Sequence, residues 1–224
     1  MTCIKTVSFD ADQTLFDFQR TLEDALNAVS AFLYDDFGLQ ISAQVLRSTR
    51  DEIYEQSRGH AMEMLTIRRL SFQRVLVGHP DCDMIVEQAM QLFEDVRFGT
   101  VYWYPDTREV LRQLKEQFQL VLITNGNSDP ERAGLEGVFD HILLGEKFSF
   151  KKPDPRIFHE MFKRAKVQNP ATVCHVGDSL AHDVKGANGV GAVSVWFNAE
   201  GQSNKTDIVP NHTISSMSEL TELL

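Results

Sequence analysis

Two carboxylic acids, Asp10 and Asp12, stand two residues apart in the segment DADQT, directly after the β-rich run IKTVSF. At the end of a strand, such a pair can project toward one cleft and divide an acid–base reaction between them. One carboxylate can act as nucleophile and metal ligand, while the other protonates a leaving group and then activates water. This division needs different environments, because like charges close together raise the pKa of one partner. Taken alone, the pair is equally well explained as a solvated loop or a helix N-terminus.

Three further polar clusters follow later in the chain. Thr124 and Asn125 open TNGN, whose hydroxyl, amide and backbone N–H groups suit a phosphate oxyanion. Lys152 precedes a proline turn in KKPDP and can place a point charge in a cleft. Asp178 in GDS offers Mg²⁺ a hard oxygen ligand, and Asp183 in the next helix can support it. A turn, a surface lysine and a helix cap are the plain alternatives for each cluster alone.

The segments that must position these clusters alternate between strand and helix. Buried strands are expected at residues 4–9, 120–124, 172–176 and 192–196. Helices are expected at residues 106–117, 155–166, 180–188 and 216–224. This alternation predicts an α/β fold with a parallel sheet covered on both faces. In open sheets of this kind, ligands bind beyond the carboxyl ends of the strands, where the polar clusters lie.

Residues 16–99 differ in character, because apolar residues recur there at helical spacing. The apolar face of the first helix comprises Leu22, Ala25, Leu26, Val29, Phe32 and Leu33. Ser42 is predicted to cap a second helix that ends at about Arg58. Further helices are expected over residues 61–77 and 83–96. This segment is therefore predicted to be an all-helical insertion after the first strand, and residues 1–15 and 100–224 to be the α/β core.

Composition and charge limit the classes of function that the chain can have. Hydrophobic residues make up 42% and charged residues 24%, which is typical of a globular protein. The net charge of −10 removes most of the attraction to phosphate backbones, so no nucleic-acid partner is expected. Three widely spaced cysteines form no disulfide framework and indicate a reducing compartment. Because no run suits a signal peptide or membrane span, we expect a cytoplasmic monomer or homodimer with no membrane partner.

The four clusters FDADQT, TNGN, KKPDP and GDSLAHD, in this order, resemble the motifs of the haloacid dehalogenase (HAD) superfamily. Its hallmark is DxDxT after the first strand, then a Ser or Thr, a Lys before a turn, and an acidic GD motif. The resemblance covers about residues 1–15 and 100–224, and residues 16–99 match a type-I cap of subfamily I by position and character. It implies a Rossmann-like HAD core with a parallel sheet and an all-helical cap.

The resemblance also implies a Mg²⁺-dependent phosphatase that acts on a small phosphorylated metabolite. Asp10 would attack phosphorus to form an aspartyl-phosphate and would also bind the metal. Asp12 would be the general acid and base, and its backbone carbonyl would contact Mg²⁺. Asp178 would complete the metal site and Asp183 would support it. This assignment fits the need of phosphoryl transfer for positioning and charge neutralisation.

In the same resemblance, Thr124 and Lys152 bind the transferring phosphoryl group, with Asn125 beside them. Lys152 thereby takes part in catalysis by neutralising charge. Gln13 departs from the family, which often has Gly at that position near the hinge of the cap.

Other reactions of the superfamily fit less well. Its dehalogenases lack the second Asp of the first motif and need no metal, whereas Asp12 is present here. Its phosphonatases use a cap lysine, and residues 17–98 contain none. Phosphomutases keep both acids and remain open. A non-catalytic binding protein, or a protein that docks partners through its helices, would be favoured by a degraded catalytic set, and this set is intact.

The substrate is indicated only by a resemblance. The stretch ITNGNSDPERAGLEGVFDHIL looks like FMN and 5-amino-6-(5-phosphoribitylamino)uracil phosphatases, so a flavin-pathway phosphate is the first expectation. Nucleoside monophosphates and sugar phosphates are the alternatives. Six arginines of the insertion are candidates to reach distal groups of a substrate, although a solvated helix face is the more common role for each one. They are Arg47, Arg50, Arg58, Arg68, Arg69 and Arg74.

Overall fold

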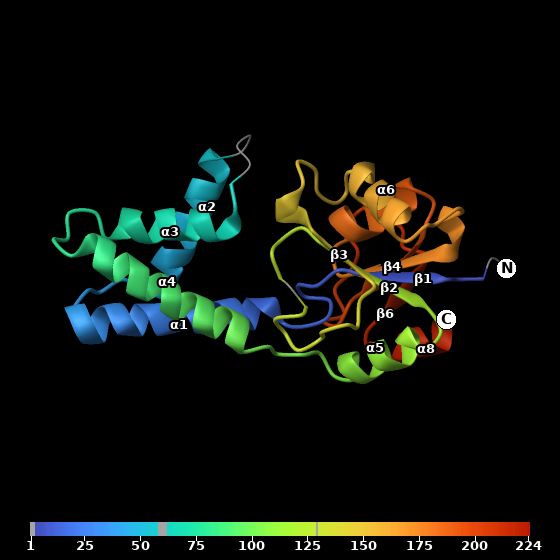
Figure 1. Cartoon of the computed structure of the whole chain (residues 1–224), viewed down its shortest axis with the longest axis horizontal. Coiled ribbons are helices and arrows are strands. Elements are labelled where there is room, and N and C mark those ends of the chain that lie inside the picture. Colours follow the sequence, from blue (N-terminus) through green and yellow to red (C-terminus); the bar gives the residue numbers. More distant parts are fainter. Residues whose placement is uncertain (1–2, 58–61, 129) are drawn as a thin grey trace. The chain divides into compact units, whose positions relative to one another are not determined.

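A computed structural model describes residues 3–57, 62–128 and 130–224 (Figure 1). The helix end predicted at Arg58, the helix start predicted at residue 61 and the candidate side chain of Arg58 lie outside the described residues. The chain divides into two compact units. The α/β unit comprises Met1–Asp17 and Trp103–Leu224, and the helical unit comprises Phe18–Tyr102.

The α/β unit is built on a six-stranded sheet whose strand order is β3-β2-β1-β4-β5-β6. The strands are β1 (Thr6–Phe9), β2 (Gln119–Thr124), β3 (His141–Leu144), β4 (Val173–Gly177), β5 (Val193–Phe197) and β6 (His212–Ile214). Every neighbouring pair is parallel, which confirms the predicted sheet. The sequence analysis missed β3 and β6, the two edge strands, because each begins with a histidine and is only partly buried, so its apolar run is too short to stand out.

Helices cover the sheet on both faces. They are α5 (Thr107–Lys115), α6 (Pro155–Arg164), α7 (Lys185–Gly189) and α8 (Ser218–Leu223). Figure 1 shows α6 on one side of the strands and α5 with α8 on the other. The Asp154 side chain caps α6 by accepting a hydrogen bond from the Arg156 backbone N–H at 2.9 Å. The predicted helix over 180–188 is instead a π-helical turn, Leu180–Val184, followed by α7.

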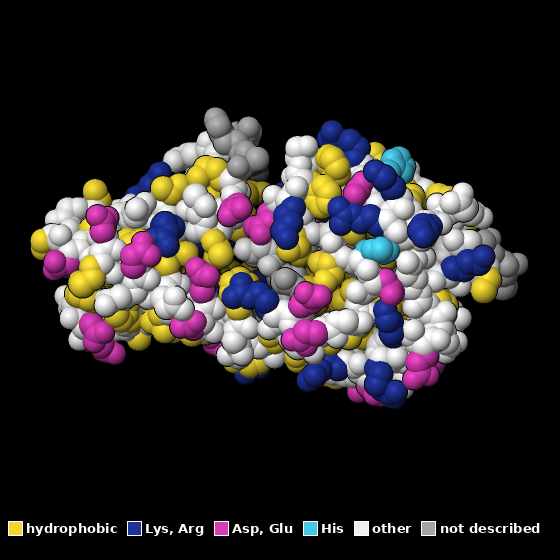
Figure 2. Space-filling model, viewed as in Figure 1, with side chains coloured by type: hydrophobic (Ala, Val, Ile, Leu, Met, Phe, Trp, Pro, Cys, Tyr) yellow, Lys and Arg dark blue, Asp and Glu magenta, His cyan; other side chains and the backbone are white. Residues whose placement is uncertain are grey.

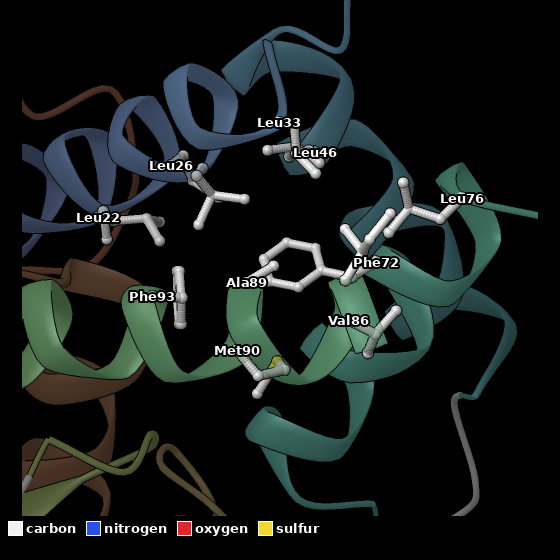
Figure 3. Close-up of a cluster of buried hydrophobic side chains, with 13 residues drawn as sticks. Leu22, Leu26, Leu33, Leu46, Phe72, Leu76, Val86, Ala89, Met90 and Phe93 are labelled. Atoms are coloured by element: carbon white, nitrogen blue, oxygen red, sulfur yellow. The ribbon is translucent and has the colours of Figure 1, made fainter. Parts of the chain in front are cut away.

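The described part of the helical unit contains four helices, as its periodicity predicts. They are α1 (Phe18–Phe37), α2 (Ala43–Gln56), α3 (Met64–Val75) and α4 (Cys82–Gly99). Ser42 caps α2 as expected, because its hydroxyl accepts a hydrogen bond from the Val45 N–H at 3.3 Å. Figure 3 shows Leu22 and Leu26 of α1 facing Phe93 of α4, which confirms the predicted apolar face.

The surface agrees with the composition. On the face shown in Figure 2, Asp and Glu side chains are interspersed with Lys and Arg over both units. Within the described part of the chain, no helix combines the length and the apolar character that crossing a membrane requires.

Candidate active site

Three neighbouring strands bring the predicted site residues to one edge of the sheet. In the register of the sheet, Phe9 at the end of β1 pairs with Leu122 of β2 and Val176 of β4. Asp10 therefore follows β1 beside the end of β4, and its N–H donates to the Val176 carbonyl at 2.9 Å. Segments more than a hundred residues apart in the sequence converge because parallel strands present their carboxyl ends together.

Lys152 lies beyond the carboxyl ends of these strands, between two of the acids. Its Nζ donates to Asp10 Oδ1 and to Asp183 Oδ1, each at 2.6 Å. The Lys152 side chain is only 1% exposed, and both carboxylates are buried with it. A buried ammonium is tolerated when oppositely charged groups satisfy it, so one lysine here holds two acids together.

The charges of this trio shift one another's pKa values. Burial alone would lower the pKa of Lys152, but the Asp10 and Asp183 carboxylates raise it above the usual value, so the ammonium stays protonated. Burial raises the pKa of Asp10, and the neighbouring carboxylates of Asp183, Asp12 and Asp178 raise it further against the effect of Lys152. Burial would also raise the pKa of Asp183, but Lys152 and His175 hold it well below its ordinary range.

Asp178 is held at the end of β4 by its backbone and side chain. Thr14 Oγ1 accepts a hydrogen bond from the Asp178 N–H at 3.0 Å and lies 3.3 Å from Asp178 Oδ1, to which it can donate. Trp196 Nε1 of β5 donates to the Asp178 carbonyl at 2.8 Å. Burial, with the Asp183 charge next in importance, raises the pKa of Asp178 to about 6.

The carboxylates of Asp10, Asp178 and Asp183 can offer one oxygen each within 4.8 Å of one another. Burial, together with the neighbouring carboxylates, raises the pKa of Asp10 and of Asp178, and Lys152 offsets this effect only in part. An all-oxygen donor set with excess negative charge fits a hard divalent cation such as Mg²⁺. The Asp12 side chain is not part of this group, and the sequence analysis had assigned only its backbone carbonyl to the metal.

Asp12 faces a different set of partners. Its carboxylate accepts a hydrogen bond from the Ser128 hydroxyl, a residue that the sequence analysis did not single out. The backbone of Gly126 lies beside it, since a Cβ placed there would be 3.3 Å from Asp12 Oδ2. Thr124 Oγ1 accepts from the Gly126 N–H at 3.2 Å, which leaves its own proton to be donated. Asp12 and Thr124 thus both lie beside Gly126 in the loop that follows β2, close enough to act on one substrate as proton donor and phosphate ligand.

Asn125 has a structural role beyond the one expected. Its side-chain amide donates to the Lys152 carbonyl at 2.9 Å and accepts from the Lys152 N–H at 2.8 Å. Both ends of the amide are therefore engaged with the backbone of one residue. Asn125 therefore fixes the position of the lysine, and its expected place beside the phosphoryl group stays a prediction.

A buried chain of polar groups supports the site from within the sheet. Ser8 of β1 and His175 of β4 are register partners, and Ser8 Oγ lies 2.7 Å from His175 Nδ1. His175 Nε2 lies 3.1 Å from Asp183 Oδ1. Because Asp183 is ionised and can only accept, Nε2 carries the proton and Nδ1 accepts from Ser8. Burial lowers the pKa of His175 against the pull of Asp183, so the ring is neutral.

The residues that the sequence analysis missed are polar groups inside or just after strands. Ser8 and His175 interrupt the apolar runs of β1 and β4, and a polar side chain in a buried strand needs a partner. That signal was available in the sequence. Their pairing, and the contact of Ser128 with Asp12, depend on strand register and loop path, which the sequence does not display.

A family model described as haloacid dehalogenase-like hydrolase matches residues 4–191. The glyceraldehyde 3-phosphate phosphatase of Methanopyrus kandleri is 29% identical over 99% of this chain and 97% of its own length. The 5-amino-6-(5-phospho-D-ribitylamino)uracil phosphatase of Escherichia coli is 28% identical over 99% and 96%.

A solved structure described as a 2-haloacid dehalogenase from Pseudomonas syringae is 29% identical to this chain. Its TM-score is 0.85, and the match covers 98% of this chain and 97% of that one. The relatives therefore share one fold over nearly their whole length, while their names cover two reactions.

Proposed function

The chain belongs to the haloacid dehalogenase-like hydrolase family, and from this premise we propose that it is a Mg²⁺-dependent phosphatase acting through an aspartyl-phosphate on Asp10. It is an enzyme of the HAD type, with phosphatases among its curated relatives. The observation that carries the proposal is the ion pair of Lys152 with Asp10, next to a second acid, Asp12, in a separate environment.

In the first step, an oxygen of Asp10 forms a bond to phosphorus while the bond between phosphorus and the ester oxygen breaks. The leaving oxygen takes its proton from Asp12. In the second step, water gives a proton back to Asp12 and attacks phosphorus, which releases inorganic phosphate and restores the Asp10 carboxylate. Dividing the reaction between two carboxylates requires that they sit in different surroundings, and Asp12 has its own partner in Ser128.

Charge neutralisation supports both steps. The Lys152 ammonium and the Thr124 hydroxyl donate to phosphoryl oxygens, on which negative charge is spread in the transition state. Asp10, Asp178 and the Asp12 backbone carbonyl would hold Mg²⁺, with Asp183 supporting them, and the bound ion would supply further positive charge to those oxygens. Asn125 keeps Lys152 in place through the two hydrogen bonds to its backbone.

Dehalogenation is the second candidate, because one similar structure is described as a 2-haloacid dehalogenase. That reaction displaces a halide and needs no proton donor for the leaving group. The chain keeps an acid at position 12 and gathers three further carboxylates suited to a cation, and both features favour phosphate chemistry. Phosphatase activity therefore ranks first.

For the substrate, we propose a small metabolite that carries its phosphate on a polyhydroxy chain. The names of two relatives describe substrates of this kind, glyceraldehyde 3-phosphate and a phospho-ribitylamino-uracil. The flavin-pathway phosphate expected from the sequence stays within this class, while nucleoside monophosphates are the alternative. We propose that the helical unit acts as the type-I cap of the family and chooses among them.

The test is phosphate release from a panel of esters with Mg²⁺, repeated with EDTA, using wild type and Asp10→Asn. The panel contains glyceraldehyde 3-phosphate, the ribitylamino-uracil phosphate, FMN, nucleoside monophosphates and p-nitrophenyl phosphate, and L-2-chloropropionate is assayed for chloride release. We expect metal-dependent phosphate release that Asp10→Asn lowers at least about a thousandfold. Chloride release without phosphate release, or turnover unaffected by EDTA, would reject the proposal.

A further inference from the structure

The arginines of the helical unit differ in how they are partnered. Arg69 donates to Glu87, and Arg74 donates to Gln56 at 3.1 Å and is 45% exposed, so both belong to solvated helix faces. Arg68 is different because it is only 4% exposed. Among the ion pairs between described residues, none includes Arg68.

The groups in direct contact with the Arg68 guanidinium are neutral. Its Nη1 donates to the Leu46 carbonyl of α2 at 3.0 Å. Its Cζ lies 4.9 Å from the centre of the Phe93 ring and 5.8 Å from that of Phe72. A backbone carbonyl and aromatic faces hold a cation in place but do not neutralise its charge.

Two more arginines lie on α2, the helix whose Leu46 carbonyl binds Arg68. Arg50 follows Leu46 by four residues and so lies one turn further along the same face, while Arg47 is adjacent to Leu46. Arg50 Nε is buried without a hydrogen-bond partner. Burial lowers the pKa of Arg68 to about 9, with the charges of Arg50 and Arg47 adding to the effect and Asp51 opposing it.

The acid nearest to these arginines does not balance them. Arg50 Nη1 is 3.1 Å from Asp51 Oδ1, but the Asp51 side chain is 54% exposed. This ion pair is weak, because the exposed Asp51 carboxylate is screened by solvent. Three guanidiniums thus stand against one solvated carboxylate, which leaves an excess of positive charge and an unused buried donor.

We propose that Arg47, Arg50 and Arg68 form a binding site in the helical unit for an anionic group, a phosphate or a carboxylate. Such a group has the charge that the cluster lacks and the oxygens that planar guanidinium donors bind bidentately. The Arg50 side chain is 19% exposed and Arg47 is half-buried, so the site can be reached from solvent. The anion is either a second acidic group of the substrate, a reading that rests on the proposed function, or a free anion.

The first test uses sulfate as the probe and needs no activity. Thermal melts of the full chain are recorded in rising sodium sulfate and in sodium chloride of equal ionic strength, for wild type, Arg50→Gln and Arg74→Gln. We expect sulfate to raise the Tm of wild type and Arg74→Gln by about 3 to 8 °C more than chloride does. Arg50→Gln should lose most of that difference and keep its Tm at low salt, because it relieves like-charge repulsion.

An equal sulfate increment in wild type and Arg50→Gln would overturn the site, because any sulfate bound at the catalytic edge is common to both. A fall in the low-salt Tm of Arg50→Gln together with an unchanged increment would make Arg50 a structural residue only. These results do not depend on turnover, so they remain readable if the enzyme proves not to be a phosphatase.

The second test separates the two sources of the anion. KM is measured for 2-phosphoglycolate, which carries a carboxylate, and for p-nitrophenyl phosphate, which carries no second acid. If the anion is part of the substrate, Arg50→Gln raises KM for the first about tenfold and leaves the second unchanged. If both KM values stay unchanged while the sulfate increment is lost, the site binds a free anion.

Discussion

Both units of the molecule bury a basic side chain, and their surroundings are opposite in kind. Lys152 in the α/β unit lies 2.6 Å from two carboxylates, and its pKa is raised above the usual value. Arg68 in the helical unit lies against a carbonyl and two rings, and its pKa is lowered to about 9. Burial disfavours the charge of both, so the direction of each shift reports whether neighbouring charges compensate for it.

The two buried cations also differ in where the charges around them come from. The charges around Lys152 come from Asp10 after β1 and Asp183 after β4, and these opposite charges compensate the buried ammonium, which is typical of a prearranged catalytic site. The charges around Arg68 come from two adjacent helices and are unmatched. Loss of the Lys152 charge should therefore lower the free energy of unfolding strongly, whereas loss of the Arg68 charge should change it little.

The largest effect is expected for Lys152→Met. Removing the ammonium leaves Asp10 and Asp183 buried side by side, so the free energy of unfolding at pH 8 should fall by about 3 to 5 kcal/mol. Urea unfolding of Lys152→Met and of the control Lys151→Ala measures it. The control removes the adjacent Lys151 side chain, which forms no part of the ion-pair cluster. Its free energy of unfolding should change by less than about 0.5 kcal/mol. Equal losses in the two variants would show that the ion pairs do not stabilise the fold.

Gly177→Ala tests how closely the acids are packed. A Cβ at Gly177 would lie 2.2 Å from Asp183 Cγ, so the carboxylate must shift from Lys152. We expect a loss of about 2 to 3 kcal/mol in stability and a large loss of turnover. Gly189→Ala is the matched control, because nothing lies within 4 Å of a Cβ there. If Gly177→Ala behaves like this control, the packing around Asp183 is looser than described.

Asp178→Asn tests the excess negative charge at the sheet edge. The pKa of Asp178 is raised from 3.8 to about 6, so above pH 6 the ionised group is disfavoured in the folded state. As pH falls from 6 to 4, the folded state takes up the proton first and this penalty disappears. In EDTA the variant should therefore be more stable than wild type by about 2 kcal/mol at pH 8 and equal to it near pH 4.

Added Mg²⁺ should reverse the order at pH 8, because it stabilises the wild type through Asp178. Urea unfolding at pH 8, 6 and 4, with EDTA or Mg²⁺, measures both effects. A stability difference that does not vary with pH would contradict the assignment of the raised pKa to this carboxylate.

Arg68→Met tests the uncompensated cation of the helical unit. Methionine retains apolar contact with Phe93 while it removes the unmatched charge and one hydrogen bond to Leu46. We expect a change of about 1 kcal/mol or less at low salt, well below that of Lys152→Met. Urea unfolding of the two variants side by side decides this, and a loss above about 3 kcal/mol would show that Arg68 is compensated after all.

An equally small effect is expected for Ser8→Ala. The hydroxyl is one hydrogen bond to His175 Nδ1, so its loss should lower stability by about 1 kcal/mol. In a His175→Phe background the same change should have almost no effect, because its partner is gone. If the double-mutant cycle gives additive losses, Ser8 does not act through His175 and so does not help to position Asp183.

Much of the fold could be predicted from local patterns. The helical unit followed from the spacing of residues such as Leu22, Leu26 and Val29, and the main strands followed from short β-rich runs. The edge strands β3 and β6 did not, because each short, partly exposed run depends on pairing with its single neighbouring strand. The π-helical turn at Leu180–Val184 also escaped, since its residues are compatible with an ordinary helix.

The sequence by itself determined which side chains are available at the strand ends, including Asp10, Asp12 and Lys152, and the order in which they occur. Only the tertiary structure decided how they are paired: Lys152 with Asp10 and Asp183, and Asn125 with the Lys152 backbone. The physical reason is that a motif fixes residue types over a few positions, whereas these contacts join segments 27 to 142 residues apart and depend on how the strands and loops are packed. The same holds for Arg68, whose uncompensated charge became visible only once α2 and α3 were packed together.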